Sequence, residues 1–333
     1  MLQYPSKEDL PTRPRLVFMG TPDFALPTLK ALIRQGHHIL SVVTQPDRPK
    51  GRGKKMTAPP VKLMALEQGI EVLQPERASE AFFCEQIERM EPDLIVVVAF
   101  GQILKERLLT IPEWGVINIH GSLLPRYRGA APIQWAILND DTKTGLTVMR
   151  MNEGLDTGPI LFQEEVPILK DETAGSLHDR LALRAGDLII DALNRMSRST
   201  IEETPQDDAL ATYAPKVEKK MSVIDWKHPA PNVSALIRAL DPLPGAYTTW
   251  QGKVIKLFSS RAVALGRLDV IPGRIVGLCE GGLVVESGQG AVEVGEMQYP
   301  GKKRLPAKQF LQGFSLPDGT ILGEQGGGLS WGE

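Results

Sequence analysis

Short apolar runs alternate with amphipathic helical patterns over the first 200 residues of the chain. The run Asp93–Phe100 is the most apolar and is typical of a parallel strand that is buried on both faces. The predicted strands are Arg15–Met19, His38–Thr44, Glu71–Leu73, Asp93–Phe100, Val116–His120, Leu146–Met151 and Ile160–Val166. The predicted helices are Ala25–Gln35, Ser79–Met90, Ala130–Leu138 and Thr173–Met196. This alternation predicts the α/β class, with a Rossmann-like, doubly wound, mostly parallel sheet.

Further details of this pattern indicate the direction of the last two strands and the place of a ligand. The last two strands, Leu146–Met151 and Ile160–Val166, are too close in sequence for a helical crossover, so we expect antiparallel neighbours. The turn after the first strand reads GTPDF rather than G-x-G-x-x-G, which gives no support to a bound NAD or FAD. Ligands of open α/β sheets bind beyond the carboxyl ends of the strands, where we expect Gly20, Phe100 and His120.

The pattern changes after residue 200. A polar stretch with Pro205 and Pro215 and little apolar periodicity predicts a linker. Short strands separated by turn signals such as Gln251-Gly252 follow, and they predict a small C-terminal OB-like β-barrel. The expected organisation is a polar N-terminal extension over 1–14, a catalytic domain over 15–200, a linker over 201–220, the barrel over 221–323 and a tail over 324–333.

Composition narrows the class of protein. The chain has 333 residues, 42% of them hydrophobic, and a net charge of -2, which fits a globular protein and argues against a generally basic nucleic-acid coat protein. Residues 211–333 hold 14 Lys and Arg against 11 Asp and Glu, so this part carries about +3 and the rest about -5. This asymmetry is mild, but it has the sign that a nucleic-acid surface needs.

Cysteines and apolar segments indicate the compartment. Cys84 and Cys279 are far apart and give neither metal spacing nor a disulfide framework, as is usual in a reducing compartment. No apolar run approaches the roughly 18 residues of a membrane helix. The polar N-terminus lacks the apolar core of a secretory signal and mixes acids with bases. We therefore expect a cytoplasmic protein that does not bind membranes.

The candidate chemistry begins with the sequence NIHGSLLP, which starts at Asn118. Residues i and i+2 of a strand share a face, so Asn118 and His120 are expected side by side. Asp156, in the glycine-bounded loop GLDTG, is either a turn former or a partner of His120. An amide donor, an imidazole and a carboxylate are the minimum set for acyl transfer between nitrogens, because they can stabilise an oxyanion and move protons. A strand end that merely meets water is the alternative.

The residues after His120 predict a binding cleft rather than a catalytic nucleophile. Ser122 does not stand in the G-x-S-x-G pattern of a nucleophile elbow. Leu123, Leu124 and Pro125 form a stiff apolar loop that would open a binding cleft. The two arginines that follow, Arg126 and Arg128, would either meet an anion there or be solvated.

A basic insertion follows the second predicted strand. The stretch Thr44–Pro60 contains one acid, Asp47, four prolines and two glycines, and it is far longer than an ordinary βα connection. Its basic residues are Arg48, Lys50, Arg52, Lys54 and Lys55. A solvated insertion is one interpretation. The other is a mobile arm that grips a polyanion, since the insertion lies at the carboxyl end of a strand and beside the expected cleft.

Taken together, GTPDFALPTL, TQPDRPKGRGKK, NIHGSLLPRYRGAAPIQ and MNEGLDTGPIL resemble the bacterial-type methionyl-tRNA formyltransferases, within the 10-formyltetrahydrofolate-dependent formyltransferase family. The resemblance implies that Asn118, His120 and Asp156 are catalytic. It implies folate contacts at Ser122, Leu123, Leu124 and Pro125, and tRNA contacts in the basic insertion and the barrel. The expected partners are 10-formyltetrahydrofolate as a co-substrate and initiator methionyl-tRNA, with no metal, and the expected state is a monomer.

Three alternatives stay open at this point. Another formyl-folate enzyme, such as a hydrolase or a sugar-nucleotide formyltransferase, would share the trio but gives no reason for the basic insertion. A glycinamide ribonucleotide formyltransferase would lack the barrel. A non-catalytic RNA-binding protein would use the barrel and the insertion, but it would have no need for Asn118, His120 and Asp156 together.

Overall fold

The computed structural model describes residues 10–50, 53, 55–198, 200–265 and 269–323, in two compact units. Unit 1 consists of Met1–Pro132, Thr144–Val166 and His178–Ala214. Unit 2 consists of Ile133–Lys143, Pro167–Leu177 and Pro215–Glu333. The two units therefore alternate along the sequence. Residues 1–9 of the expected extension and the expected tail, 324–333, lie outside the described residues.

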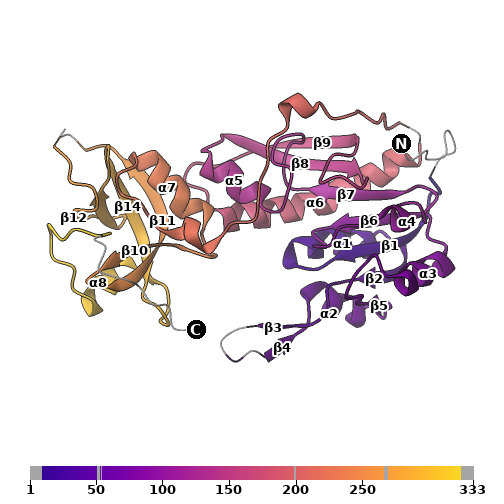
Figure 1. The fold of residues 1–333 in the computed structure, drawn as a ribbon, viewed down its shortest axis with the longest axis horizontal. Helices are drawn as coiled ribbons and strands as arrows, with labels where there is room; N and C mark the ends of the chain where they lie inside the picture. The colour runs from indigo at the N-terminus through magenta and orange to yellow at the C-terminus, as the bar shows by residue number, and fades with distance from the viewer. Residues whose placement is uncertain (1–9, 51–52, 54, 199, 266–268, 324–333) are drawn as a thin grey trace. The chain divides into compact units, whose positions relative to one another are not determined.

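Unit 1 is built on a seven-stranded sheet with the order β5-β2-β1-β6-β7-β8-β9 (Figure 1). Its strands are β1 (Arg15–Gly20), β2 (His38–Val43), β5 (Val72–Leu73), β6 (Leu94–Val98), β7 (Val116–His120), β8 (Lys143–Arg150) and β9 (Ile160–Pro167). The first five of these strands are mutually parallel, and β8 runs antiparallel to β7. The predicted α/β class with a mostly parallel, doubly wound sheet is confirmed.

The pairing of β8 with β9 also agrees with the sequence. The two strands are neighbours in the sheet. At one end Arg150 N donates to Pro159 O, and at the other end Ile168 N donates to Thr142 O, both at 2.9 Å. Rising residue numbers on one strand therefore meet falling numbers on the other, so the predicted antiparallel arrangement is confirmed.

Helices bury both faces of this sheet. They are α1 (Leu26–Arg34), α2 (Pro60–Glu67), α3 (Ala81–Met90), α4 (Glu106–Leu109) and α6 (Ala174–Met196), whose first turn is counted with unit 2, together with the 3₁₀ turn η1 (Asp23–Ala25). A further 3₁₀ turn of this unit, η2 (Asp208–Leu210), is exposed. On one face, Val17 and Val97 share a core with Phe83 of α3 and Leu108 of α4. The alternate residue Phe18 points to the other face and is fully buried.

The first βα turn shows why a glycine ends β1. A Cβ at Gly20 would lie 2.9 Å from Val98 O and 2.8 Å from the Ala25 Cβ, which no larger residue tolerates. The turn therefore brings η1 directly against the end of β6. Helix α1 begins with a proline in its first turn and is followed by Gly36 with φ 73°, the usual start and stop signals of a helix.

The strand order identifies the ligand-binding edge of the sheet. From β1 the chain moves outward to β2 and β5, and then returns to β6 and β7 on the other side of β1. The order therefore reverses between β1 and β6, the kind of switch point at which α/β sheets leave a crevice at their carboxyl ends. Gly20, Phe100 and His120 follow or end strands at this edge, as the sequence predicts.

The basic insertion is a short hairpin in its described part. The strands β3 (Arg48–Lys50) and β4 (Lys55–Thr57) pair antiparallel, and Figure 1 draws them as an extension beside α2, apart from the main sheet. The sequence pattern predicts no strand here, because proline and glycine weaken the strand signal.

The segment expected to be a linker is bound to unit 1. Residue Thr204 pairs with Ile160, and Tyr213 pairs with Arg128. Arg128 N donates to Thr212 O, and Ala214 N donates to Arg128 O, each at 2.8 Å. Residues 204–214 therefore cross both the end of β9 and the loop after β7 before the chain enters unit 2.

Unit 2 contains an antiparallel sheet with the order β10-β11-β14-β13-β12, and β15 pairs with β14. Its elements are α5 (Pro132–Leu138), η3 (Lys219–Ser222), α7 (Ala230–Ala239), β10 (Ala246–Trp250), β11 (Lys253–Val263), β12 (Ile275–Leu278), β13 (Leu283–Glu286), β14 (Ala291–Gln298), β15 (Leu305–Pro306) and α8 (Ala307–Gly313). The predicted run of short C-terminal strands is confirmed, and closure into a barrel stays a prediction.

Helix α7 fills the core of unit 2. Its Val233 and Ile237 pack with Leu257 of β11 and Val294 of β14. Its Arg238 donates to Asp140 at 2.8 Å, which ties the segment after α5 to this unit. The sequence pattern predicts only strands in this part of the chain, and it predicts none of the helices α2, α4 and α8. The positions i, i+3 and i+7 of Ala230, Val233 and Ile237 are a signal that could have found α7.

Candidate active site

The residues of the predicted trio meet at the carboxyl edge of unit 1. Asn118 and His120 lie on β7 with side chains that point to one face, and they are 9% and 6% exposed. The His120 Nδ1 lies 3.7 Å from Asp156 Oδ2. The structure therefore brings the imidazole and the carboxylate together, as one of the two sequence interpretations predicts.

The other ring nitrogen of His120 has a fixed partner. His120 Nε2 lies 2.8 Å from Tyr127 O, and because a carbonyl oxygen only accepts, Nε2 carries the hydrogen in this contact. The Nδ1 atom is then the nitrogen that remains for chemistry. In the neutral ring Nδ1 holds a lone pair, so a proton or a donor group fits between it and the Asp156 carboxylate.

The Asp156 carboxylate is held by the backbone of the loop after β7. Gly129 N donates to Asp156 Oδ2 at 2.8 Å, and this is the same oxygen that faces His120. Asp156 has φ 53°, in the left-handed region that L residues seldom adopt. The side chain thus bridges two loops rather than capping its own turn.

The amide of Asn118 has no assigned bond. In the register of the sheet Asn118 lies between Val97 of β6 and Met149 of β8, both buried. Within the part of the chain that the structure describes, its side chain makes no hydrogen bond. A nearly buried amide is usually satisfied, so an unused one at a strand end is a candidate donor for a ligand.

The loop Ser122–Pro125 is fixed from β8 and β9. Thr147 Oγ1 donates to Ser122 O at 2.6 Å and accepts from Leu124 N at 3.1 Å. Gln163 Nε2 donates to Leu124 O at 2.8 Å. Ser122 is fully buried, and its hydroxyl donates to Arg126 O, so within this loop Leu123 and Pro125 are the residues with partly exposed side chains.

Polar residues that the sequence analysis does not single out surround this site. Besides Thr147 and Gln163, they include Gln206, whose Nε2 donates to Asp156 O at 2.8 Å and to Gly158 O at 2.7 Å. Arg128 is 2% exposed and donates to Gln206 Oε1, so it is neither solvated nor open to an anion. A lone Gln in a polar stretch carries no sequence signal that separates it from its neighbours.

The basic hairpin is charged and exposed where it is described. Arg48 and Lys55 are exposed and, within the described residues, form no ion pair. The hairpin's acid, Asp47, is hydrogen-bonded by Lys62 at 2.8 Å and by Gln74, which hold the pKa of this carboxyl below its ordinary value. Arg52 and Lys54 lie outside the described residues, as does the side chain of Lys50.

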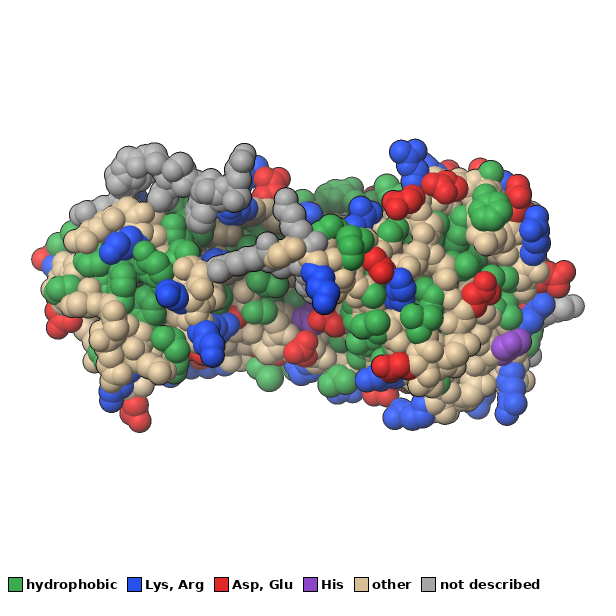
Figure 2. Space-filling view, turned by 90° about the horizontal axis from the view of Figure 1, so that it is seen from below, with side chains coloured by type: hydrophobic (Ala, Val, Ile, Leu, Met, Phe, Trp, Pro, Cys, Tyr) green, Lys and Arg blue, Asp and Glu red, His purple; other side chains and the backbone are tan. Residues whose placement is uncertain are grey.

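The basic character of the surface is local. Figure 2 shows basic and acidic side chains interspersed over the face that it presents. Among the described residues, none of the helices has the length and apolar content that a membrane crossing demands. The described residues also contain no group of three or more His, Cys, Asp or Glu side chains arranged as metal ligands.

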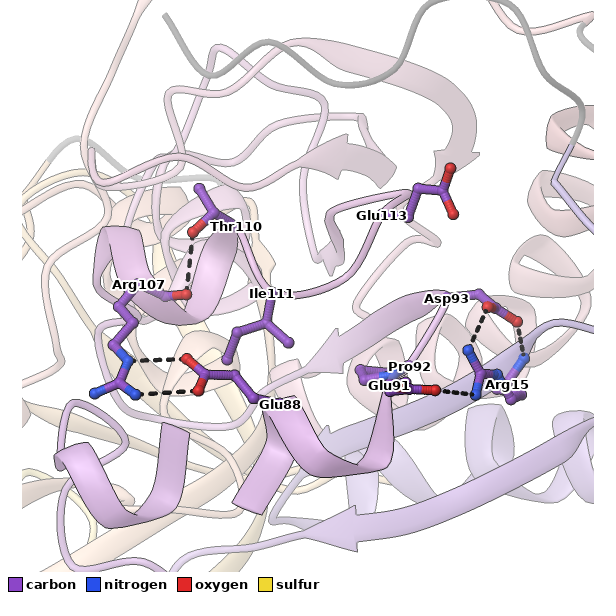
Figure 3. A pocket seen from close by; sticks show the side chains of 9 residues that line it. All are labelled: Arg15, Glu88, Glu91, Pro92, Asp93, Arg107, Thr110, Ile111 and Glu113. Carbon is purple, nitrogen blue, oxygen red and sulfur yellow. Dashed lines mark hydrogen bonds and ion pairs between the residues drawn. The ribbon is translucent and has the colours of Figure 1, made fainter. Parts of the chain in front are cut away.

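A surface pocket lies at the opposite, amino edge of the same sheet (Figure 3). Its lining residues are Arg15, Glu88, Glu91, Pro92, Asp93, Arg107, Thr110, Ile111 and Glu113. Arg15 bonds Asp93 and Glu91, and Arg107 holds Glu88 through two hydrogen bonds. Both arginines of this pocket are therefore engaged by neighbouring carboxylates.

Comparison with known proteins gives the same relatives for both units. A family model described as formyl transferase matches residues 14–193, and one described as formyl transferase, C-terminal domain, matches residues 216–315. A methionyl-tRNA formyltransferase of Geobacter metallireducens is 50% identical over 309 residues, or 92% of this chain and 98% of that protein. Another, of Moorella thermoacetica, is 47% identical over 312 residues, or 93% and 99%.

Solved structures share the fold at low identity. HypX from Aquifex aeolicus in complex with tetrahydrofolic acid has a TM-score of 0.62 and 20% identity, over 90% of this chain and 47% of that one. An N-formyltransferase from Helicobacter canadensis in complex with folinic acid and dTDP-3-aminofucose has a TM-score of 0.64 and 18% identity, over 84% and 98%. These likenesses support the fold of the chain.

Proposed function

The chain belongs to the formyl transferase family, and we propose that it acts as a methionyl-tRNA formyltransferase. It transfers the formyl group of 10-formyltetrahydrofolate to the α-amine of methionyl initiator tRNA. The observation that carries this proposal is the meeting of Asn118, His120 and Asp156 at the carboxyl edge of the sheet, in a chain whose relatives over nearly its whole length are methionyl-tRNA formyltransferases.

Asn118 supplies the donor for the formyl oxygen. When the amine attacks the formyl carbon, this oxygen gains negative charge, and a fixed amide N–H stabilises the charge more than it stabilises the neutral formyl group. The amide makes no hydrogen bond to the described residues and is nearly buried, so it does not have to leave another partner to do this.

His120 and Asp156 move the proton. The attacking amine loses a proton as the new C–N bond forms, and the folate nitrogen gains a proton as the old C–N bond breaks. His120 Nδ1 takes and returns this proton, directly or through water, because Nε2 is occupied by Tyr127 O. The Asp156 carboxylate stabilises the protonated ring and orients the incoming amine. These steps use no metal.

The folate is a co-substrate beside the loop Ser122–Pro125. The side chains of Leu123 and Pro125 are partly exposed and offer apolar contact to its ring system. Ser122 and Leu124 are buried, so their contacts with folate are made through the backbone. The bonds from Thr147 and Gln163 keep this backbone in one conformation.

The basic hairpin and the barrel hold the tRNA. The arm residues of this proposal are Arg48, Lys50, Arg52, Lys54 and Lys55. The hairpin follows β2, so it leaves the sheet at the same edge as His120. Arg48 and Lys55, which are exposed and form no ion pair within the described residues, suit phosphates, because their attraction is not spent within the protein. We propose that the protein works in the cytoplasm as a monomer.

The decisive experiment supplies radiolabelled 10-formyltetrahydrofolate with methionyl initiator tRNA, with a dTDP-amino sugar, or with no acceptor. We expect label in methionyl initiator tRNA, and neither in a dTDP-amino sugar nor as free formate when acceptor is absent. Label in the sugar or in formate would replace the proposal with a sugar formyltransferase or a hydrolase. Stoichiometric tRNA binding without folate turnover would leave an RNA-binding protein instead.

A further inference from the structure

The side chain of Gln206 joins two loops of the candidate active site. Its Nε2 donates to Asp156 O and to Gly158 O, at 2.8 and 2.7 Å. Its Oε1 accepts from Arg128 Nε at 3.0 Å and from Arg128 Nη2 at 2.8 Å. One amide group thus spends both of its donors and its acceptor on the segments that carry Asp156 and Arg128.

The burial of Gln206 differs from that of its neighbours. Gln206 is partly buried, whereas all the remaining residues from 202 to 210 are exposed. Its partner Arg128 is 2% exposed and also forms an ion pair with Asp208 at 2.8 Å. A buried guanidinium requires satisfied partners, and two carbonyls without donors would be costly, so the arrangement holds together only with an amide at this point.

The two loops that Gln206 joins are the ones that meet at the catalytic carboxylate. Gly129, the residue after Arg128, donates its N–H to Asp156 Oδ2, the oxygen that faces His120. The Asp156 backbone has φ 53°, a conformation that surrounding bonds have to maintain in an L residue. Gln206 supplies one of those bonds at the Asp156 carbonyl itself.

We propose that Gln206 is a positioning residue for the transfer reaction: its amide locks the Asp156–Gly158 turn against Arg128, so that the Asp156 carboxylate sits between Gly129 N and His120 Nδ1. Gln206 does not touch the substrates. Its effect passes through the carbonyl oxygens and Arg128. The inference rests on the proposed function, because it assigns a support to the carboxylate that the proposed reaction uses.

The kinetic test compares three variants. In Gln206→Ala we expect kcat to fall by about 10²-fold, the typical result of misplacing a catalytic group by about 1 Å, with both KM values near those of the wild type. Gln206→Glu keeps the side-chain volume but turns acceptor oxygens toward two carbonyls, so its loss should be at least as large. Thr110→Ala is the control, because Thr110 Oγ1 donates to two carbonyls, Glu106 O and Arg107 O, at the amino edge of the sheet and outside the site. It should retain kcat.

A second measurement does not depend on activity. The Gly129 amide signal reports the bond to Asp156, and ¹³C-carbonyl arginine with ¹⁵N-glycine selects the two Arg–Gly steps of the chain, at Gly53 and Gly129. Asp156→Asn identifies the Gly129 signal by moving it. We expect Gln206→Ala to shift the same signal and to accelerate its hydrogen exchange, and Thr110→Ala to leave it in place.

The outcomes separate the two proposals. A Gln206→Ala protein with wild-type kcat per folded molecule would overturn the positioning role, and so would an unmoved Gly129 signal, even if kcat fell. A Gln206→Glu protein more active than Gln206→Ala would show that side-chain volume or the acceptor for Arg128 matters more than the two N–H donors, which contradicts the proposed role of the amide. If the wild type failed to formylate methionyl-tRNA, the proposed function would fall, while the Gly129 signal would still decide whether Gln206 holds the carboxylate.

Discussion

The polar side chains at the two edges of the unit 1 sheet differ in their hydrogen bonding. At the amino edge, Arg15 bonds Asp93 and Arg107 bonds Glu88, so both arginines of that pocket are matched. At the carboxyl edge, the Asn118 amide makes no hydrogen bond within the described residues. His120 Nδ1 stands 3.7 Å from the Asp156 carboxylate, beyond hydrogen-bond distance.

This difference distinguishes polar side chains that stabilise the structure from polar side chains that can bind a ligand. Matched ion pairs at an exposed edge hold a surface together and need no ligand. The nearly buried Asn118 amide and His120 Nδ1 form no hydrogen bond within the described residues, so they can bind a ligand. The carboxyl edge also receives the supporting bonds of Thr147, Gln163 and Gln206, which hold its loops and leave the reacting atoms free. The predictions below test this contrast.

The largest effect is expected from the reacting groups. We predict that Asn118→Ala and His120→Ala fold and still bind folate, because their removal leaves no charge buried. Turnover should fall by about 10²–10³-fold for Asn118→Ala, the usual cost of one oxyanion donor, and His120→Ala should lose at least as much. Single-turnover formylation with saturating substrates measures it. Near-normal turnover in either variant would remove that residue from the mechanism.

The carboxylate should rank next. We predict that Asp156→Asn lowers turnover by about 10²-fold, because an amide supplies no negative charge to the protonated His120 ring. Thr157→Ala is the matched neighbour, since Thr157 Oγ1 donates to Asn152 Oδ1 and not to a residue of the trio, and it should have a small effect. If Asp156→Asn reduced thermal stability but left the rate per folded molecule intact, the turn-forming interpretation of the loop would be correct.

Variants of the basic insertion Thr44–Pro60 test whether this segment also takes part in the function of the carboxyl edge. We predict that Arg52→Ala weakens the use of tRNA and leaves folate binding unchanged, because Arg52 stands between two glycines and its backbone can approach a phosphate closely. Replacing all five basic residues should flatten the salt dependence by roughly 0.7–0.9 log units per decade for each lost phosphate contact. Formylation rates against tRNA concentration at several salt levels measure both. An unchanged dependence would make the arm a solvated insertion.

The sequence predicts correctly those helices and strands in which the spacing of buried residues matches the period of the element. β7 is found with its observed bounds, Val116–His120, because alternate residues face two buried layers and a glycine precedes it. The hairpin of β3 and β4 is missed because Pro49 and the glycines remove the strand signal. Helix α2, Pro60–Glu67, is missed because apolar residues lie on several of its sides and give little helical period.

The sequence predicts the reacting groups of the site, but it does not predict the residues that hold them in place. Asn118 and His120 are visible because strand geometry fixes their shared face. Asp156 is visible as the single carboxylate of a glycine-bounded loop. Gln206 lies 50 residues after Asp156 and contacts it only because residues 204–214 fold back over unit 1. No local pattern encodes such a contact, so side-chain support of this kind requires the structure.

The smallest effect is expected at the amino edge. Arg107 donates two hydrogen bonds to Glu88 and holds the pKa of that carboxyl below its ordinary value of 4.5. A lowered pKa in the folded state means that this pair stabilises the fold above the ordinary pKa and stops doing so as pH falls through the lowered value. We predict that Arg107→Leu slightly lowers the melting temperature at neutral pH, that the difference shrinks well below pH 4.5, and that kcat is unchanged.

Thermal unfolding at the two pH values, with formylation kinetics on the same samples, measures this prediction. Glu88→Gln should behave like Arg107→Leu, and the double variant should lose no more than either single one, because each change removes the same pair. A fall in kcat in Arg107→Leu would break the contrast between the edges, since it would show that the matched pair at the amino edge also serves the reaction. Unchanged kcat with the expected pH dependence keeps catalysis at the carboxyl edge.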